Sequence, residues 1–195
     1  MPGLGVARPK VLIVGLAPAA HGANRTGRLF TGDRSGDWLF ASMYRVGLAN
    51  QPTSLYIGDG LELIDTRMIA AVRCAPPQNK PTVEERDNCA RWLDAELALV
   101  AGDVRVVVAL GSFGWDAAIR SLRLAGWTVP APKPKFGHGA TATLGAPHGE
   151  VELLGCYHPS QQNTFTGKLT EEMTDDVLGR AAEIARMGRP PYPNR

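Results

Sequence analysis

The sequence has few cysteines, no long apolar run and almost no net charge, and the first two of these shortages each exclude a class of protein. Its 195 residues include only three cysteines, an odd number that makes no disulfide framework, so we expect a reducing, cytoplasmic environment. No apolar run approaches the roughly 20 residues of a membrane span, and the N-terminus lacks a signal-peptide pattern. The formal net charge of +2 neither requires nor excludes a polyanionic partner.

The composition that remains is typical of one globular domain. Apolar residues make up 44% and charged residues 21% of the chain, which is long enough to bury a core. We expect a single domain over 1–195, in which 1–9 is a lead-in without periodicity and 188–195 is a tail. The sequence contains no internal repeat and gives no indication of oligomeric state, although we expect a monomer.

Short apolar runs alternate with stretches of helical periodicity along the chain. The expected buried strands are Lys10–Val14, Met68–Val72, Val104–Leu110 and Val151–Tyr157, with a further short strand at Ser54–Ile57 and a hairpin or irregular excursion within Trp127–Gly149. The expected helices begin at Asp37, Thr82, Gly111-Ser112 and Thr170, and they end near Gly47, Gly102, Leu122 and Met187. This alternation predicts an α/β fold with a parallel sheet and helices on both faces.

Three polar loops follow three of the expected strands. They cover Ala17–Ser35, Cys74–Pro81 and His158–Gly167. Because the carboxyl ends of parallel strands lie at one edge of the sheet, these loops should converge on one cleft. The first loop is long for a simple connection, and loops of that length are usually functional or disordered. The placement predicts a site without naming a reaction.

His158 and Asp33 are the strongest candidates for chemistry. His158 directly precedes Pro159, which restricts the backbone and holds the imidazole in place. This histidine can donate a hydrogen bond to a developing anion, or it is a loop residue without a role. The Asp33 carboxylate can orient water or stabilise a cationic sugar, or it can cap a helix. For Asp37 we expect the helix cap.

Other side chains of these loops also allow two interpretations. Phe30 can stack on a planar base or belong to the core, and Asn79 can contact a base or water or serve as a turn residue. Basic side chains that can contact phosphate, or form a solvated surface, are Arg25, Arg28, Arg34, Lys133, Lys135 and Lys168.

Two of the three cysteines stand close enough in the sequence to consider a metal site. Cys74 and Cys89 would supply half of a tetrahedral zinc or iron–sulfur site, although unpaired cysteines are more often buried small side chains. Cys156 lies inside an expected strand and is assigned to the core.

Together these segments resemble the uracil-DNA glycosylase superfamily, and most closely its family 5 (type-5, or B-type) enzymes. The resemblance covers nearly the whole chain in order: Gly15–Asp33, Val72–Pro81 with Glu84 to Arg86 and Cys89, Ala109–Gly111, Lys135–Gly139 and His158–Gly167. The long first and last motifs are the most specific.

The resemblance implies a three-layer α/β/α fold around a parallel four-stranded sheet. It also implies a monofunctional DNA repair glycosylase that flips uracil and related deaminated or damaged bases out of the helix and excises them, initiating base excision repair. The partner would be single- or double-stranded DNA. By the same resemblance, family 5 enzymes also accept hypoxanthine and ethenocytosine.

The resemblance assigns roles residue by residue. Asp33, Asn79 and His158 would be catalytic. The base-binding set would be Ala17, His21, Phe30, Asn79 and His158, and the DNA-binding set would be Arg25, Arg28, Ser160, Gln161, Gln162, Asn163 and Lys168. Other families carry an acidic or amide residue around the position of Ala17, so its absence here agrees with family 5. Stabilisation of the leaving base should then dominate over activation of water.

The resemblance further implies a [4Fe-4S] cluster held by four cysteines. Cys74 and Cys89 match the later pair, whereas the earlier pair belongs to a segment upstream of the first strand, which here begins at Lys10. Either the start codon has been placed too late, which we favour, or the protein lacks the cluster. Two thiolates alone would not hold it.

Two other functions compete with the glycosylase. One is a catalytically impaired relative that binds damaged DNA without an intact cluster, and the other is a small-molecule enzyme such as a nucleoside hydrolase. A steep fall of DNA affinity with salt would separate the DNA-binding functions from the last.

Overall fold

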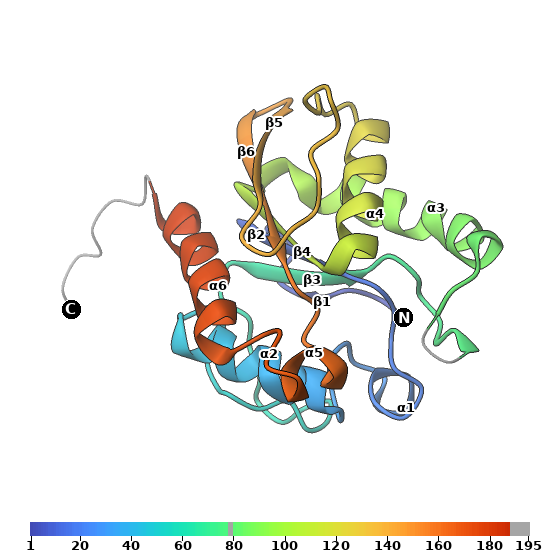
Figure 1. Cartoon of the computed structure of the whole chain (residues 1–195), viewed down its shortest axis with the longest axis vertical. Helices are drawn as coiled ribbons and strands as arrows, with labels where there is room; N and C mark the ends of the chain where they lie inside the picture. Colours follow the sequence, from blue (N-terminus) through green and yellow to red (C-terminus); the bar gives the residue numbers. More distant parts are fainter. Residues whose placement is uncertain (78–79, 188–195) are drawn as a thin grey trace.

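The computed structural model describes residues 1–77 and 80–187, which form a mixed sheet of six strands between two layers of helices (Figure 1). The strands are β1 (Leu4–Gly5), β2 (Val11–Gly15), β3 (Thr66–Ala70), β4 (Val106–Leu110), β5 (Thr141–Ala146) and β6 (Gly149–Cys156). Their order is β1-β3-β2-β4-β6-β5. The central four are parallel, and both edge strands run antiparallel to their neighbours. The predicted parallel four-stranded sheet is therefore confirmed, with an added strand at each edge.

Helices cover both faces of this sheet. The helices of the described chain are α1 (Ala23–Thr26), α2 (Arg34–Arg45), α3 (Val83–Val100), α4 (Gly111–Leu124), α5 (Gln161–Phe165) and α6 (Glu171–Arg186), with a 3-10 turn η2 (Ala101–Asp103) after α3. Of these, α2, α3, α4 and α6 pack on the faces of the sheet. One apolar cluster joins the sheet to α3 and α4, and a second joins it to α2 and α6. The predicted three-layer α/β/α arrangement is thus confirmed.

The strand β2 shows why the apolar runs form the centre of the sheet. Val11 to Val14 are all fully buried. Leu12 and Val14 pack in the cluster with α3 and α4, whereas Val11 and Ile13 pack in the cluster with α2 and α6, as alternating side chains of a strand must. A strand covered on both faces is apolar throughout its length, which explains the absence of a period-two pattern.

Most helix starts follow the predicted caps, but one does not. The Thr82 hydroxyl and the Glu85 carboxylate form a reciprocal capping box at α3, and Thr170 caps α6. The prediction that Asp37 caps the next helix after the first loop is wrong. Asp33 does so, because its carboxylate accepts from the Gly36 N–H at 2.9 Å and α2 begins at Arg34.

Three other expectations about local structure are corrected. The segment Ser54–Ile57 is not a strand, because its backbone turns back on itself instead of pairing with the sheet. The lead-in contains β1, whose Leu4 and Gly5 pair with β3. The second strand begins two residues earlier than expected, at Thr66. Within the described part of the chain, no helix is both long and apolar enough to span a membrane.

Candidate active site

The first and last polar loops meet at the carboxyl ends of β2 and β6 and enclose a small cavity. The residues that line it are Gly15, Leu16, Ala17, Pro18, Ala19, Ala23, Leu29, Phe30, Asp33, Ser35, Ala70 and His158. A wider groove of about 390 Å³ adjoins it and shares six of these residues, adding Arg34, Ser160, Gln161 and Gln162. The predicted convergence of these two loops is therefore present. The described residues of the second polar loop, by contrast, contribute nothing to either lining.

Phe30 forms one wall of the cavity from an unusual backbone conformation. Its φ is 52°, in the left-handed region that residues other than glycine seldom occupy. Its ring centroid lies 6.1 Å from that of His158, with the planes inclined at 32°. Gly36 permits this turn, because a Cβ there would lie 1.7 Å from the Phe30 carbonyl oxygen. Phe30 thus presents its ring to the space in front of His158.

His158 forms the opposite wall and is fixed by contacts from its own loop. Its carbonyl oxygen accepts from the Ser160 N–H and from the Asn163 side-chain amide, each at 2.8 Å. Burial lowers the pKa of the half-buried imidazole, while the negative charge of Asp33 acts in the opposite direction. The ring is therefore neutral at pH 7 and can donate one hydrogen bond.

Asp33 both caps α2 and lines the cavity. One carboxylate oxygen caps α2, and the other lies over Gly22, where a Cβ would come within 2.1 Å of it. Asp33 also lines both the cavity and the groove together with His158. The two interpretations of Asp33 offered by the sequence are thus compatible.

The three other predicted base-binding residues differ in their positions. Ala17 lines both the cavity and the groove. His21 is exposed and lies outside both linings. Asn79 lies outside the described residues.

The polar residues predicted to bind DNA in and after the last loop have different surroundings. Ser160 caps α5 by accepting from the Asn163 N–H, and Gln161 and Gln162 are exposed along the groove. Asn163 was predicted to contact DNA, but its amide is engaged with the His158 carbonyl. The Lys168 ammonium lies 4.9 Å from the Tyr157 ring centroid, a cation–π distance.

The two predicted phosphate-binding arginines of the first motif have different surroundings. Arg25 is exposed, and its Nε donates to the His21 carbonyl at 3.0 Å. Arg28 is only 9% exposed and is paired with Asp59. The structure does not support the prediction that Arg28 contacts DNA, because its guanidinium is enclosed and donates to Thr31, Ser54 and Asp59.

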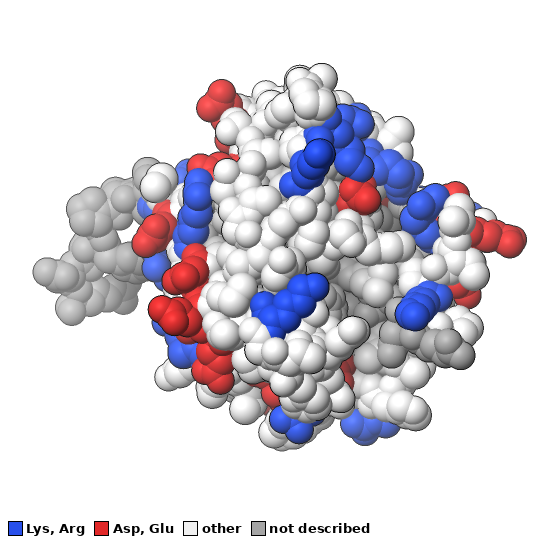
Figure 2. Space-filling view, in the orientation of Figure 1, with Lys and Arg blue, Asp and Glu red and all other residues white. Residues whose placement is uncertain are grey.

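Charge is unevenly distributed over the face shown in Figure 2. Asp and Glu side chains gather toward its left, over α6, while Lys and Arg occupy its centre and its upper right. A polyanion approaching the centre of this face would meet little opposing charge.

Sequence reasoning missed two residues that contact the site's framework. Asp59 lies 31 positions from its partner Arg28, so no local pattern could have indicated it. His138 accepts through Nδ1 from the N–H of Tyr157, the residue directly before His158, at 3.2 Å. Burial lowers the pKa of the His138 imidazole. Within the segment Lys135–Gly139 a single histidine carries no spacing signal, so only the family resemblance points to this segment.

The cysteines do not form a complete metal site. Cys74 is exposed on the loop after β3, Cys89 is half-buried in α3, and Cys156 is buried in β6, where burial raises the pKa of its thiol to about 12. Across residues 1–77 and 80–187, no group of three or more potential ligands gathers in a metal-binding arrangement. Two thiols do not suffice for a [4Fe-4S] cluster, so the described residues do not fit this group on their own.

Comparisons with known proteins agree on one family. A family model described as the uracil DNA glycosylase superfamily matches residues 2–181. A type-5 uracil-DNA glycosylase from Mycobacterium bovis is 57% identical over 185 residues, which cover 95% of this chain and 66% of the relative. Type-5 enzymes from Mycobacterium leprae and Thermus thermophilus are 54% and 48% identical, again over 95% of this chain, and over 78% and 80% of their own lengths. The chain thus spans just under two thirds of the length of the Mycobacterium bovis relative.

Proposed function

The chain belongs to the uracil-DNA glycosylase superfamily and to its type-5 group, and on this premise we propose that it hydrolyses the N-glycosidic bond of uracil in DNA. Related deaminated or damaged bases would be further substrates, and excision would initiate base excision repair. The observation that carries this proposal is the pair of facing rings, Phe30 and His158, across a small cavity at the carboxyl edge of the sheet.

A cavity of this kind suits a single base taken out of the DNA helix. The glycosidic bond cannot be reached inside the base stack, so enzymes that act on it extrude the nucleotide. The extruded base would enter the cavity and stack on the Phe30 ring, because ring centroids 6.1 Å apart leave no room for a base between the Phe30 and His158 rings themselves. A stacking contact of this kind contributes about 1–3 kcal/mol per base.

His158 would act on the leaving group. As the bond to the sugar breaks, negative charge develops on the oxygens of the base. A neutral imidazole held at the cavity wall donates a hydrogen bond that strengthens as this charge grows. The lowered pKa of His158 supports this role, because it keeps the ring neutral near pH 7.

Asp33 would act on the sugar. Its carboxylate lies on the cavity wall beside His158, where it can stabilise a cationic sugar or orient the attacking water. Ala17, which lines the same cavity, offers no acid or amide for that purpose. Stabilisation of the leaving base therefore contributes the larger share of the rate enhancement in this proposal. Asn79 remains a further candidate.

The groove beside the cavity would hold the DNA strand. Ser160, Gln161 and Gln162 line it, and two exposed cations belong to the neighbouring chain segments, Arg25 in the first polar loop and Lys168 directly after the last. Either single- or double-stranded DNA containing uracil would be a partner for such a groove.

Cys74 and Cys89 would supply two of the four thiolates of a [4Fe-4S] cluster. This part of the proposal rests on the accessibility of both thiols and on the matching motif, and no catalytic step depends on it. Iron and sulfide should be found in a chain extended by an upstream cysteine segment, and Cys74→Ser should remove them while Cys156→Ser should not. A colourless extended protein would refute the assignment.

The activity itself is tested with a labelled oligonucleotide that contains one uracil, treated with alkali after incubation. Cleavage at the uracil, and not at thymine in a matched oligonucleotide, supports the proposal. If neither uracil nor hypoxanthine is released while DNA is still bound, the chain is a damaged-DNA-binding relative instead.

A further inference from the structure

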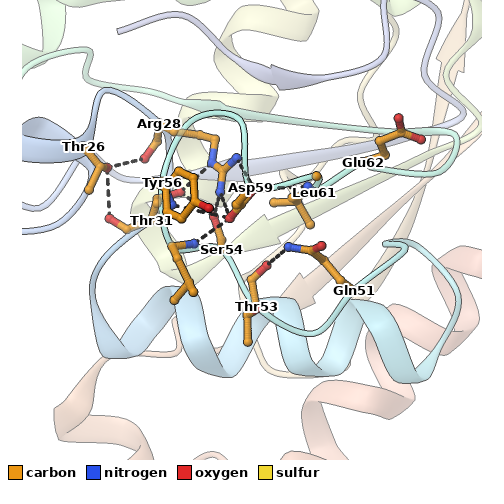
Figure 3. Close-up of polar contacts among 12 residues, drawn as sticks. Thr26, Arg28, Thr31, Gln51, Thr53, Ser54, Tyr56, Asp59, Leu61 and Glu62 are labelled. Atoms are coloured by element: carbon orange, nitrogen blue, oxygen red, sulfur yellow. Dashed lines mark hydrogen bonds and ion pairs between the residues drawn. The ribbon is translucent and has the colours of Figure 1, made fainter.

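Side-chain hydrogen bonds link the two ends of the turn that carries Phe30. Arg28 and Thr31 flank this turn, and the Arg28 Nε donates to the Thr31 hydroxyl at 3.0 Å. Both also contact the Ser54 hydroxyl, Arg28 through Nη2 at 2.7 Å and Thr31 through Oγ1 at 2.5 Å (Figure 3). The two ends of the turn are therefore held by one residue of a distant loop.

Asp59 completes this network from the same loop. Its carboxylate accepts from Arg28 Nη1 at 2.8 Å and from Nη2 at 2.6 Å, and it also accepts from the backbone N–H groups of Leu55 and Leu61. The Arg28 and Asp59 side chains are 9% and 4% exposed, and no other ion pair among the described residues has both partners so enclosed. The hydrogen bonds from Arg28 hold the pKa of the Asp59 carboxyl well below its usual range, so the pair stays charged.

The Phe30 backbone needs such support. A residue with a side chain persists at a φ of 52° only where its surroundings impose that conformation. Here the residues on either side of the strained position are fixed by the buried pair and by Ser54. Without them, the turn would relax and the Phe30 ring would leave its place opposite His158.

We propose that Asp59, acting through Arg28, is a positioning residue for the Phe30 ring, so that the loop Ser54–Asp59 sets how tightly an extruded base is held. This inference rests on the proposed function, in which Phe30 stacks on the base. Asp59 itself touches no substrate. Its loss should therefore weaken recognition of the base and leave contacts to the DNA backbone in place.

The test compares two duplexes that differ only in the nucleotide at one position. One carries 2′-fluorodeoxyuridine, which resists cleavage, and the other carries a tetrahydrofuran abasic site. The ratio of their dissociation constants reports base contacts, because contacts to the DNA backbone are common to both. Asp59→Asn should reduce the preference for the uracil duplex by about tenfold or more, the size of one stacking contact.

Asp175→Asn provides a matched control. Asp175 accepts from Arg45 Nε at 2.6 Å, from Arg45 Nη2 at 2.8 Å and from the Ser42 hydroxyl, and it lies outside the cavity, between α2 and α6. Its loss should leave the ratio unchanged. In a Phe30→Ala background, Asp59→Asn should cause no further fall, because the ring that it positions is already absent.

An unchanged ratio in folded Asp59→Asn would overturn the inference, as would an equal fall in Asp175→Asn or a fully additive loss in the double variant. If Asp59→Asn does not fold, Ser54→Ala carries the test, since it removes one hydroxyl from the same network. A smaller fall in the ratio is then expected, and no fall contradicts the inference. An unaltered chain with no preference for the uracil duplex would instead overturn the proposed function.

Discussion

The two walls of the cavity are held by different kinds of contact. The carbonyl of His158 accepts hydrogen bonds from Ser160 and from Asn163, which lies five positions away. The turn around Phe30 is bonded to Ser54 and, through Arg28, to Asp59, which lies 31 positions from Arg28. The group assigned to chemistry is thus fixed by its own loop, and the group assigned to binding is fixed by a distant one.

This difference indicates that the two walls can be disturbed separately. A change in the last loop should alter the chemical step. A change in the hydrogen-bond network of Arg28, Ser54 and Asp59 should instead alter recognition of the base.

Replacement of His158 should have the largest effect. His158→Ala should slow release of uracil by about 10²–10⁴-fold, because it removes the donor to the leaving base, while DNA binding should change little. Single-turnover release and equilibrium binding measure the two quantities. His148→Ala is the control, since His148 contacts the Val104 carbonyl outside the cavity. Equal losses of release and binding in His158→Ala would refute the assigned role.

The two arginines of the first motif should respond in opposite ways. Arg28→Ala leaves Asp59 buried without its partner and should lower the free energy of unfolding by about 3–5 kcal/mol. Arg25→Ala should leave stability unchanged and should reduce the slope of log affinity against log salt by about one. Denaturant unfolding and salt titrations of DNA binding distinguish them. A reduced salt slope in folded Arg28→Ala would indicate that Arg28 contacts a DNA phosphate after all.

Asp33→Asn separates the cap from the charge, because asparagine caps helices equally well. Base release should fall about tenfold or more at pH 7 if the charge stabilises the sugar. Burial lowers the pKa of His158 and Asp33 opposes this, so loss of the charge should lower that pKa further.

The pH profile gives the sign of the effect. In the proposed mechanism the neutral imidazole is the donor, so release should persist below the usual histidine pKa of about 6.5 and decline only as pH falls through the lowered pKa of His158. In Asp33→Asn that decline should move to lower pH. Asp37→Asn, in the first turn of α2, should keep the original profile. A decline that moves to higher pH in Asp33→Asn would contradict the account.

Asn163→Ala should have the smallest effect. It removes the amide donor to the His158 carbonyl and should slow release by about fivefold, the equivalent of one hydrogen bond of about 1 kcal/mol. The preference for a uracil duplex over an abasic one should not change. A change confined to affinity and its salt dependence would show instead that Asn163 contacts DNA.

The same contrast explains what the sequence could predict. The parallel strands and the placement of Phe30, Asp33 and His158 at one edge follow from local patterns, since apolar runs, caps and proline act over a few residues. The buried partnership of Arg28 could not be predicted, because an arginine in a polar loop has the same local pattern whether it meets phosphate or a distant carboxylate. The choice between Asp33 and Asp37 as the helix cap could not be predicted, because both are plausible caps and only the position of the Gly36 N–H decides between them.

The most direct test of the separation between the walls is to measure base release and the uracil-to-abasic affinity ratio for His158→Ala and Phe30→Ala side by side. We expect His158→Ala to slow uracil release while keeping most of the uracil-to-abasic affinity ratio. We expect Phe30→Ala to lower that ratio by about tenfold or more. If both variants lose release and affinity ratio in the same proportion, the two walls do not have separate roles and the account is wrong.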